Sequence, residues 1–185
     1  MFAATAFAGK YEDALAAYER RDFATAVQLL RPLANAGNAA AQTQLGIMYS
    51  NAEGVPYSCA EAQKWYLKAV DQNYAEAKNE LGRMYFIGGD GVPMNTTQAL
   101  TLFRKSAEQG FAGAQNNLGL MYLKGEGVTQ DYVEAHKWFN LAASRLPVSS
   151  DDRYKALKNR DDVAARMTPQ QIAEAQKLAR EWKPK

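Results

Sequence analysis

The stretch "AQNNLGLMYLKGEGVTQ", residues 114–130, combines a helical pattern with three glycines. Its apolar residues recur at intervals of three and four, which is typical of one face of an α-helix. Gly119 lies inside this run, although glycine costs about 1 kcal/mol relative to alanine in a helix interior. Gly125 and Gly127 follow where the apolar pattern stops, and glycine readily adopts the positive φ angles that end helices. The stretch therefore predicts a helix and a turn, and it leaves Gly119 to be explained.

The same pattern occurs three times along the chain. Leu-Gly pairs begin at residues 45, 81 and 118, at intervals of 36 and 37 residues, and each is followed by a Met-Tyr pair. A Gly-Val pair follows at 54, 91 and 127, and an alanine stands eight residues after each of these glycines. Self-similarity at such a period indicates stacked supersecondary units. Each unit is predicted to be a helix, a glycine-bearing loop and a second helix.

The small residues explain why the helices accept glycine. Two helices approach closely only where a side chain is absent, and a bulky aromatic residue of the neighbouring helix then fills the space. Trp65, Trp138 and the aromatic residues that follow them recur at core spacing in the second helices. We therefore predict that Gly119 is a packing position.

The pattern A-x-x-x-L-G-x-M-Y…G-x-G-V…A-x-x-W-x-x-x-A resembles the Sel-one-like repeat, a class of the tetratricopeptide superfamily with a longer interhelical loop. The resemblance implies an all-α fold, an α/α superhelical solenoid of about five antiparallel helix pairs. It also implies one solenoid domain, with the following parts: an N-terminal lead-in at 1–9, a tetratricopeptide-like helix pair at 10–38, repeats at 39–74, 75–111 and 112–147, and a C-terminal capping helix pair at 148–185. Thr168, Pro169 and Gln171 predict the start of the last helix, because they supply an N-cap, a first-turn proline and a capping-box glutamine.

The composition of the chain restricts the classes of partner that we expect. The 185 residues carry a net charge of +2 without a long run of one sign. The sequence therefore has no basic cluster of the kind that binds nucleic acid or an anionic membrane surface. No uninterrupted apolar run approaches the length of a membrane-spanning helix, so we predict no membrane insertion. Cys59 is the only cysteine, which excludes an intramolecular disulfide and a CxxC site.

The first eight residues, "MFAATAFA", are small and apolar. Ala6-Phe7-Ala8 fits the A-x-A pattern that precedes a signal-peptidase cut, which favours an exported or periplasmic protein and a trimmed secretion signal. The alternative is a lead-in to the first helix of a cytoplasmic protein.

The resemblance to tetratricopeptide proteins also implies a binding face. In those proteins the first helix of each pair lines the concave side of the solenoid, where its non-core positions are available to a protein or peptide partner. Amides at these positions suit a peptide backbone, and basic residues suit a carboxylate. The predicted protein-binding residues are Thr43, Ile47, Ser50, Asn79, Arg83, Phe86, Asn116, Leu120 and Lys124.

Residues with catalytic or metal-binding chemistry are few. His136, the only histidine, lies between Ala135 and Trp138 and is predicted to face outward; one histidine and one distant cysteine do not make a zinc site. Cys59 near the start of a helix is predicted to be a small buried hydrophobe. We therefore predict no catalytic residue, no cofactor site and no metal site.

Two further motifs receive structural interpretations. Acidic neighbours at 151–152 and 161–162 diverge by about 100° on a helix and instead favour its N-terminal part. "GGDGV" at 88–92 lies between two helices rather than after a strand, so it is interpreted as a repeat loop and not as a phosphate cradle.

We therefore predict a non-enzymatic interaction module, an adaptor or scaffold, that is a monomer or a weak dimer. The alternative is a protein that binds or hydrolyses cell-wall fragments or β-lactams, as implied by cysteine-rich relatives of this repeat family. Those relatives use disulfide-paired repeats, whereas this chain has one cysteine.

Overall fold

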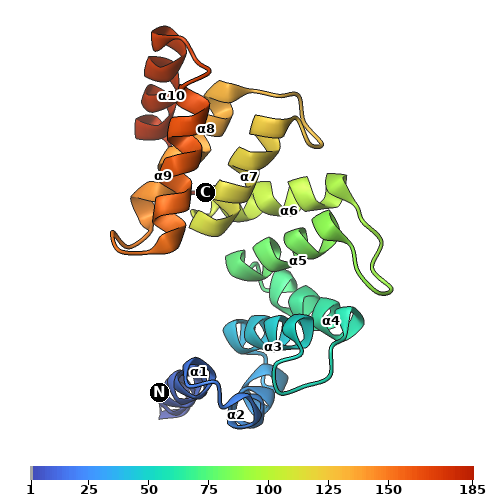
Figure 1. Ribbon diagram of the computed structural model, residues 1–185. Helices are drawn as coiled ribbons and strands as arrows, with labels where there is room; N and C mark the ends of the chain where they lie inside the picture. Colours follow the sequence, from blue (N-terminus) through green and yellow to red (C-terminus); the bar gives the residue numbers. More distant parts are fainter. Residues whose placement is uncertain (1) are drawn as a thin grey trace. The chain divides into compact units, whose positions relative to one another are not determined.

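The structure is a computed structural model that describes residues 2–185, with side chains from residue 9 onward. The candidate signal remnant in residues 1–8 therefore lies outside the described side chains. The described chain forms ten α-helices (Figure 1). Their bounds are α1 Phe2–Glu19, α2 Phe23–Asn35, α3 Ala39–Asn51, α4 Cys59–Asp71, α5 Ala75–Ile87, α6 Thr96–Glu108, α7 Ala112–Lys124, α8 Tyr132–Arg145, α9 Asp151–Ala164 and α10 Pro169–Glu181.

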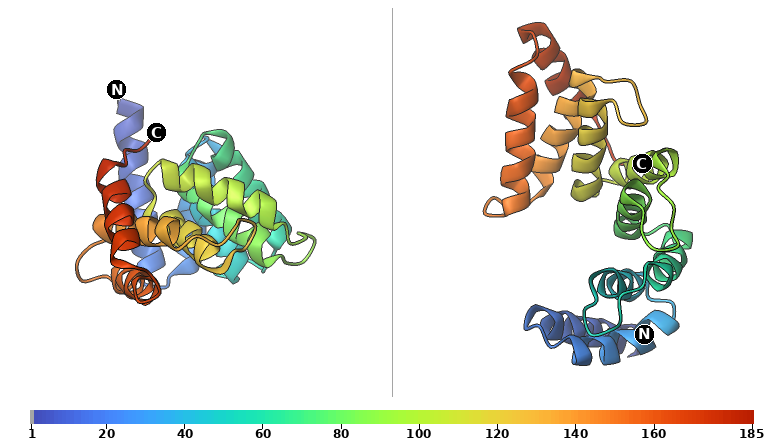
Figure 2. Two further views of the ribbon diagram at one scale, coloured as in Figure 1. Left: turned by 90° about the horizontal axis from the view of Figure 1, so that it is seen from above. Right: turned by 45° about the vertical axis from the view of Figure 1, so that its right-hand side comes forward.

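The helices form two compact units, one that ends at Asn95 and one that begins at Thr96. In the N-terminal unit each helix from α1 to α5 packs on the next, and α3 also packs on α5 (Figures 1 and 2). In the C-terminal unit α6 packs on α7 and α7 on α8, and both α9 and α10 pack on α8. The predicted all-α solenoid of stacked helices is confirmed.

Glycines inside the first helices make room for aromatic rings, as predicted. A Cβ atom built at Gly119 of α7 lies only 2.7 Å from Cε1 of Phe139 in α8. A Cβ at Gly46 of α3 meets the ring of Tyr66 in α4 in the same way. Because real Cβ atoms essentially never come so close to a neighbour, neither position accepts a side chain without movement of the ring.

The interhelical loops use residues with left-handed backbone. Gly125 ends α7 with a φ of 74°, and Gly127 follows with a φ of 73°, which confirms the turn predicted for both. In the corresponding place after α3, Ala52 adopts a φ of 58°. The longer loop after α5 contains an isolated bridge between Gly89 and Val92. The extra residue is thus accommodated in the loop, and the lengths of the flanking helices are unchanged.

Buried glutamines connect successive helix pairs, a contact that the repeat pattern alone does not reveal. Gln42 Nε2 donates a hydrogen bond to the carbonyl oxygen of Ala34 at 3.0 Å. Gln115 makes the same bond to Ala107 at 3.2 Å. Both glutamines are at least 96% buried, and each gives a second hydrogen bond to a carbonyl group in the last turn of the preceding helix, which also accepts from the N–H of Gly37 or Gly110.

The C-terminal capping pair begins and ends with specific contacts. Thr168 Oγ1 accepts from the N–H of Gln171 at 3.3 Å, and Gln171 Oε1 accepts from the N–H of Thr168 at 2.8 Å, which confirms the predicted capping box. After α10, Trp182 packs edge-on against Trp138 of α8 with ring centroids 6.2 Å apart. The N–H of Lys185 donates to the carbonyl of Glu108 at 2.8 Å, so the chain end returns to α6.

Candidate functional site

The N-terminal unit contains a cavity of about 400 Å³ between α3, α4 and α5. The residues of α3 and α5 that line it recur at intervals of three and four, which places them on one face of each helix. The lining residues are Ile47, Ser50, Asn51, Tyr57, Cys59, Tyr66, Glu80, Arg83, Met84, Ile87 and Gly88. We call this cavity the α3–α5 groove.

One wall of the α3–α5 groove carries a compensated pair of charges. Glu80 Oε2 accepts from Arg83 Nη1 at 3.0 Å, and Glu80 Oε1 accepts from Asn79 Nδ2 at 2.8 Å. The Arg83 side chain is 55% exposed, whereas that of Glu80 is 16% exposed. Glu80 therefore orients a guanidinium group that still has donors facing solvent. The groove contains one cation and one anion and has no net charge.

A second polar contact of the groove involves two hydroxyl groups. Ser50 Oγ donates to the carbonyl of Gly46 at 3.0 Å and lies 3.3 Å from the hydroxyl of Tyr66. Because the single proton of Ser50 is used, Tyr66 is the donor in the second contact. Burial raises the pKa of Tyr66 well above its usual value, so this phenol stays neutral at physiological pH. Both groups are fixed and uncharged.

The remaining wall is apolar and open to solvent. Ile87 is 70% exposed and Tyr57 is 51% exposed, and Ile47 and Met84 are half-buried beside them. The Tyr57 hydroxyl lies 2.8 Å from the Sγ of Cys59, which is buried as predicted. The groove thus combines accessible apolar surface with one oriented guanidinium.

The structure distributes the predicted binding residues of the N-terminal unit between groove and interior. Ile47, Ser50 and Arg83 line the α3–α5 groove. Thr43 is 1% exposed and donates to the carbonyl of Ala39 at 2.8 Å, and Asn79 is 4% exposed. Thr43 and Asn79 therefore lie inside the unit rather than on its surface, which corrects their predicted accessibility. Phe86 is half-buried and is not among the residues that line the groove.

In the third repeat the corresponding residues lie against the capping pair. Asn116 Oδ1 accepts a hydrogen bond from Asn159 Nδ2 of α9 at 3.2 Å. Leu120 packs against a core cluster that includes Val163 of α9. Lys124 is 56% exposed and lies 3.7 Å from Glu126. Helix α9 thus contacts Asn116 and contributes to the cluster beside Leu120, so these two residues are half-buried, whereas Lys124 stays exposed.

Three further groove residues, Tyr57, Met84 and Ile87, lie outside the row that the sequence predicts. Tyr57 comes from the loop before α4, and the two others lie beside the predicted row on α5. Ile87 carried a usable signal, because it is an apolar residue at the end of a helix where the repeat pattern has already stopped. The groove therefore extends beyond the predicted row in the N-terminal unit.

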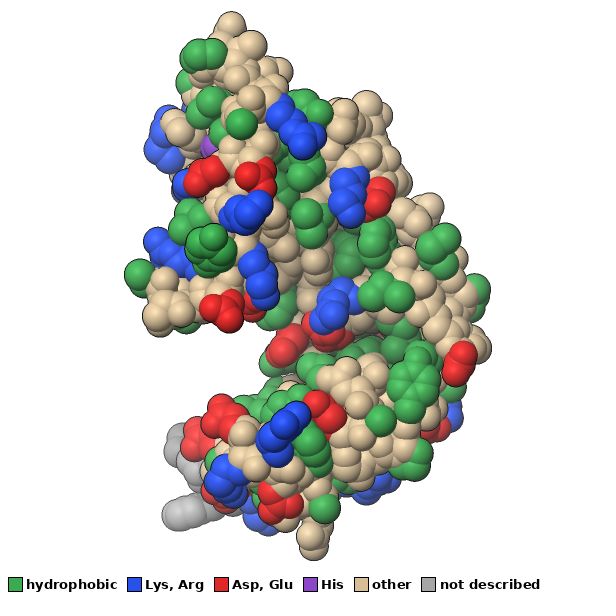
Figure 3. All heavy atoms as spheres, in the orientation of Figure 1, with side chains coloured by type: hydrophobic (Ala, Val, Ile, Leu, Met, Phe, Trp, Pro, Cys, Tyr) green, Lys and Arg blue, Asp and Glu red, His purple; other side chains and the backbone are tan. Residues whose placement is uncertain are grey.

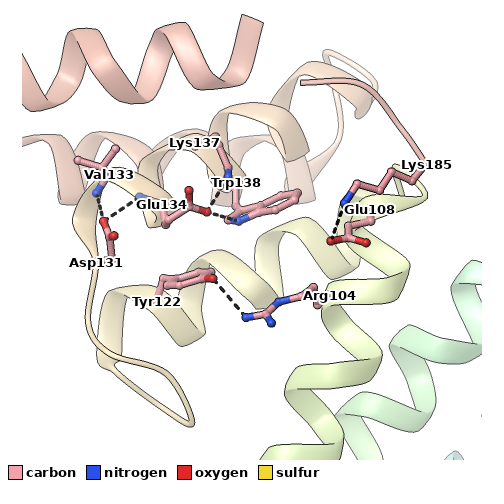
Figure 4. A network of polar contacts seen from close by, with 9 residues as sticks. All are labelled: Arg104, Glu108, Tyr122, Asp131, Val133, Glu134, Lys137, Trp138 and Lys185. Atoms are coloured by element: carbon pink, nitrogen blue, oxygen red, sulfur yellow. Dashed lines mark hydrogen bonds and ion pairs between the residues drawn. The ribbon is translucent and has the colours of Figure 1, made fainter. Parts of the chain in front are cut away.

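The polar residues at the start of α8 stabilise the helix rather than form a reactive site (Figure 4). Asp131 Oδ1 accepts from the N–H groups of Val133 at 2.8 Å and Glu134 at 3.0 Å, which caps the helix. Glu134 Oε2 accepts from Trp138 Nε1 at 3.0 Å and from Lys137 Nζ at 2.6 Å. These contacts hold the buried indole of Trp138 in place.

His136 is buried, contrary to the prediction that it faces outward. It is 3% exposed, and its Nδ1 atom has no hydrogen-bond partner. Burial lowers the pKa of His136, and the nearby Arg160 lowers it further. The prediction was wrong because the helices α9 and α10 that cover this side of α8 do not belong to the repeat pattern.

The described residues provide few features of an enzyme or a metal protein. Within them, no three His, Cys, Asp or Glu side chains gather as a group that could hold a metal ion. Across the part of the chain that the structure describes, no helix has both the length and the apolar character needed to cross a bilayer. On the face shown in Figure 3, basic and acidic side chains alternate without a large field of one sign.

Comparison with known families identifies the repeat. The Sel1 repeat model matches residues 39–74, 75–111 and 112–145, which is more than half of the chain. The chain belongs to the Sel1 repeat family. Sel1 repeat proteins are generally protein-interaction scaffolds, and their solenoid is typically a non-enzymatic interaction module. The resemblance drawn from the sequence is confirmed.

Solved structures show the same fold. A Sel1 repeat protein from Oxalobacter formigenes matches with a TM-score of 0.73 and 27% identity, over 93% of this chain and 70% of that chain. The protein c5321, a protective antigen present in uropathogenic Escherichia coli strains and displaying an SLR fold, matches with a TM-score of 0.54 and 28% identity. That match covers 85% of this chain and 40% of c5321. Among curated proteins, none matches this chain.

Proposed function

We propose that this Sel1 repeat protein is an adaptor that binds an extended segment of a partner protein in the α3–α5 groove. The observation that carries the proposal is the accessible apolar wall of the groove, above all Ile87, next to the oriented guanidinium of Arg83. Exposed apolar surface rimmed by polar groups is typical of interaction sites.

The groove suits a peptide with a particular chemistry. An apolar side chain of the peptide packs against Ile47, Met84 and Ile87, and the backbone carbonyl beside it accepts a hydrogen bond from Arg83. Because Glu80 already compensates the charge of Arg83, the groove does not require an acidic peptide. We therefore expect selection for a hydrophobic residue and little dependence of binding on salt concentration.

The test starts from the selection of peptides that bind the chain. Peptides are selected from a phage-displayed random library on the immobilised full chain, and their dissociation constants are measured for wild type and Ile87→Glu. Ile87→Glu weakens binding by about tenfold or more, because it places a charge against the apolar peptide side chain. Ile87 is largely exposed, so the variant keeps its fold.

Val148→Glu is the matched control, since Val148 is 84% exposed and lies in the C-terminal unit. It leaves the affinity unchanged. Equal affinity of the selected peptides for wild type, Ile87→Glu and Val148→Glu would contradict the groove as the binding site. Failure to select any peptide with a hydrophobic consensus would contradict the proposed ligand chemistry.

We further propose that the chain has no catalytic activity of its own, binds no nucleic acid and is a monomer or a weak dimer. The absence of disulfide-paired repeats supports this against the alternative of β-lactam or cell-wall hydrolysis, because Cys59 is the only cysteine. Nitrocefin and muropeptide turnover assays test the alternative. Saturable hydrolysis that persists after repurification would overturn our assignment.

A further inference from the structure

Helices α8, α9 and α10 of the C-terminal unit line a second pocket of about 400 Å³, which is open to solvent. It lies within that unit and is separate from the α3–α5 groove. Its polar lining comes from all three helices, and we call it the α8–α10 pocket. The polar lining residues are His136, Asn140, Arg160, Asp161, Gln176 and Arg180.

His136 is the buried polar group of the α8–α10 pocket. The residue is 3% exposed, and its Nδ1 has no hydrogen-bond partner. Buried polar side-chain atoms in native proteins nearly always have such a partner. The Nδ1 atom itself is inaccessible to a water-sized molecule, so other atoms of the imidazole form the wall of the pocket that a ligand would meet.

The charges of the lining favour an anion. Arg160 donates to Asp161 Oδ1 from Nε at 2.9 Å and from Nη2 at 2.7 Å. Arg180 is exposed, and the ion pairs of the described part of the chain do not include it. Two guanidinium groups and one carboxylate leave a net charge of +1. A single carboxylate matches this charge, whereas a phosphate carries between −1.5 and −2 near neutral pH.

The rest of the lining suits a group next to that carboxylate. Asn140 and Gln176 each offer an amide donor and an amide acceptor, which complement a peptide bond. Ala164 and Ile172 supply a small apolar wall. An acid with an adjacent amide uses all of these groups together.

We propose that the α8–α10 pocket binds a carboxylate with a neighbouring amide, the chemistry shared by a peptide C-terminus and a small N-acylated amino acid. Arg180 and Arg160 hold the carboxylate, because the planar guanidinium matches its two oxygens. The amides of Asn140 and Gln176 bind the adjacent amide. His136 completes the wall.

Binding is coupled to the charge of His136. Arg160 and Asp161 on α9 and Arg180 on α10 are the charged groups around this side of the imidazole, and the only charged residue of α7 is Lys124 at its C-terminal end. Burial and Arg160 lower the pKa of His136 in the free protein. A bound carboxylate offsets the guanidinium charges and raises that pKa, so affinity increases as the pH falls through the titration range of His136.

The experiment uses the NMR signals of His136, which are unambiguous because it is the only histidine. The tag-free full chain is titrated with N-acetyl-alanyl-alanine and, as the matched uncharged probe, with its C-terminal amide. We expect the acid to shift the imidazole signals saturably and to raise the pKa of His136, and we expect the amide to do neither. Arg180→Gln weakens binding by about tenfold. Lys177→Gln, the same charge change at an exposed residue of α10, leaves binding unchanged.

Titrations with other ligands distinguish the two sources of the carboxylate, and some of their outcomes would overturn the proposal. Tighter binding of the dipeptide than of N-acetylglycine supports a peptide C-terminus, and equal binding supports a small N-acylated acid. Tighter binding of inorganic phosphate than of both acids would overturn the carboxylate assignment. An absence of saturable shifts, or equal loss in Arg180→Gln and Lys177→Gln, would overturn the pocket. None of these results depends on the α3–α5 groove.

Discussion

The first helices of the two units share repeat positions but use them differently. In the N-terminal unit, Ile47 on α3 and Arg83 on α5 line an open groove. In the C-terminal unit, the equivalent Leu120 on α7 packs against a core cluster that includes Val163 of α9. Both side chains are half-buried, but the same helical position lines an open groove in one unit and packs beside the capping helices in the other. The elements that pack over a helix determine this difference, and the repeat sequence does not encode those elements.

The prediction with the largest expected effect concerns the packing of α9 in the C-terminal unit. Val163 is fully buried beside Ala135 and Phe139. Val163→Asp lowers the free energy of unfolding by about 3–5 kcal/mol, because it buries a charge without a partner. Val148→Asp, the same change at an exposed residue, has little effect. Urea denaturation followed by circular dichroism measures both, and equal stability of the two variants would show that α9 does not cover the row.

The next test asks whether the two units share their internal packing. Gly46→Ala and Gly119→Ala each force a Cβ atom against an aromatic ring, so each destabilises the protein by about 1–3 kcal/mol. Gly9→Ala is the control, since a Cβ there meets nothing within 4 Å. It is neutral or stabilising by up to about 1 kcal/mol. Thermal and urea unfolding of the three variants give the comparison, and a stabilising effect at Gly119 would contradict the packing role.

A smaller test compares equivalent residues directly. Leu120→Ser lowers the free energy of unfolding by about 1–2 kcal/mol, because it removes apolar contacts with the cluster under α9. Ile47→Ser lowers it by less, because part of Ile47 faces the groove, and it weakens the binding of selected peptides. Urea unfolding and peptide titration of both variants are the measurements. The reverse order of stability loss would contradict the distinction between the units.

The smallest test concerns pH. The pKa of His136 is lower in the folded protein than in the unfolded chain, so the unfolded state binds more protons between the two pKa values. The stability contributed by the neutral imidazole is complete above the unfolded pKa of about 6.5 and is lost as the pH falls towards the folded pKa. The slope is at most about 1.4 kcal/mol per pH unit. Unfolding measured across this range is less steep in His136→Gln, and an unchanged slope would exclude His136 as the cause.

The sequence predicted the architecture because the repeat itself encodes helix packing. Gly119 and the aromatic residue of the following helix recur in register, and the structure brings them together. The binding residues were harder to predict. Thr43 was expected at the surface because helical periodicity separates one face from another, but it does not reveal that a neighbouring helix buries both faces.

His136 shows the limit of the same reasoning. Its neighbours Ala135 and Trp138 were correctly interpreted as core residues, so the position between them was assigned to solvent. The helices that cover it begin at Asp151 and Pro169 and have no counterpart in the repeat. Only the three-dimensional arrangement brings Arg160 and Arg180 to the histidine.

The fit between glycine and aromatic ring has a consequence for how such a chain changes over evolutionary time. Gly46 and Tyr66 lie in the first repeat, and Gly119 and Phe139 lie in the third, so each of these two copies contains both halves of its own contact. Duplicating or deleting a whole copy therefore preserves every such contact, whereas a crossover in the middle of a copy separates its two halves. Changes in length by complete copies are the ones that this packing tolerates.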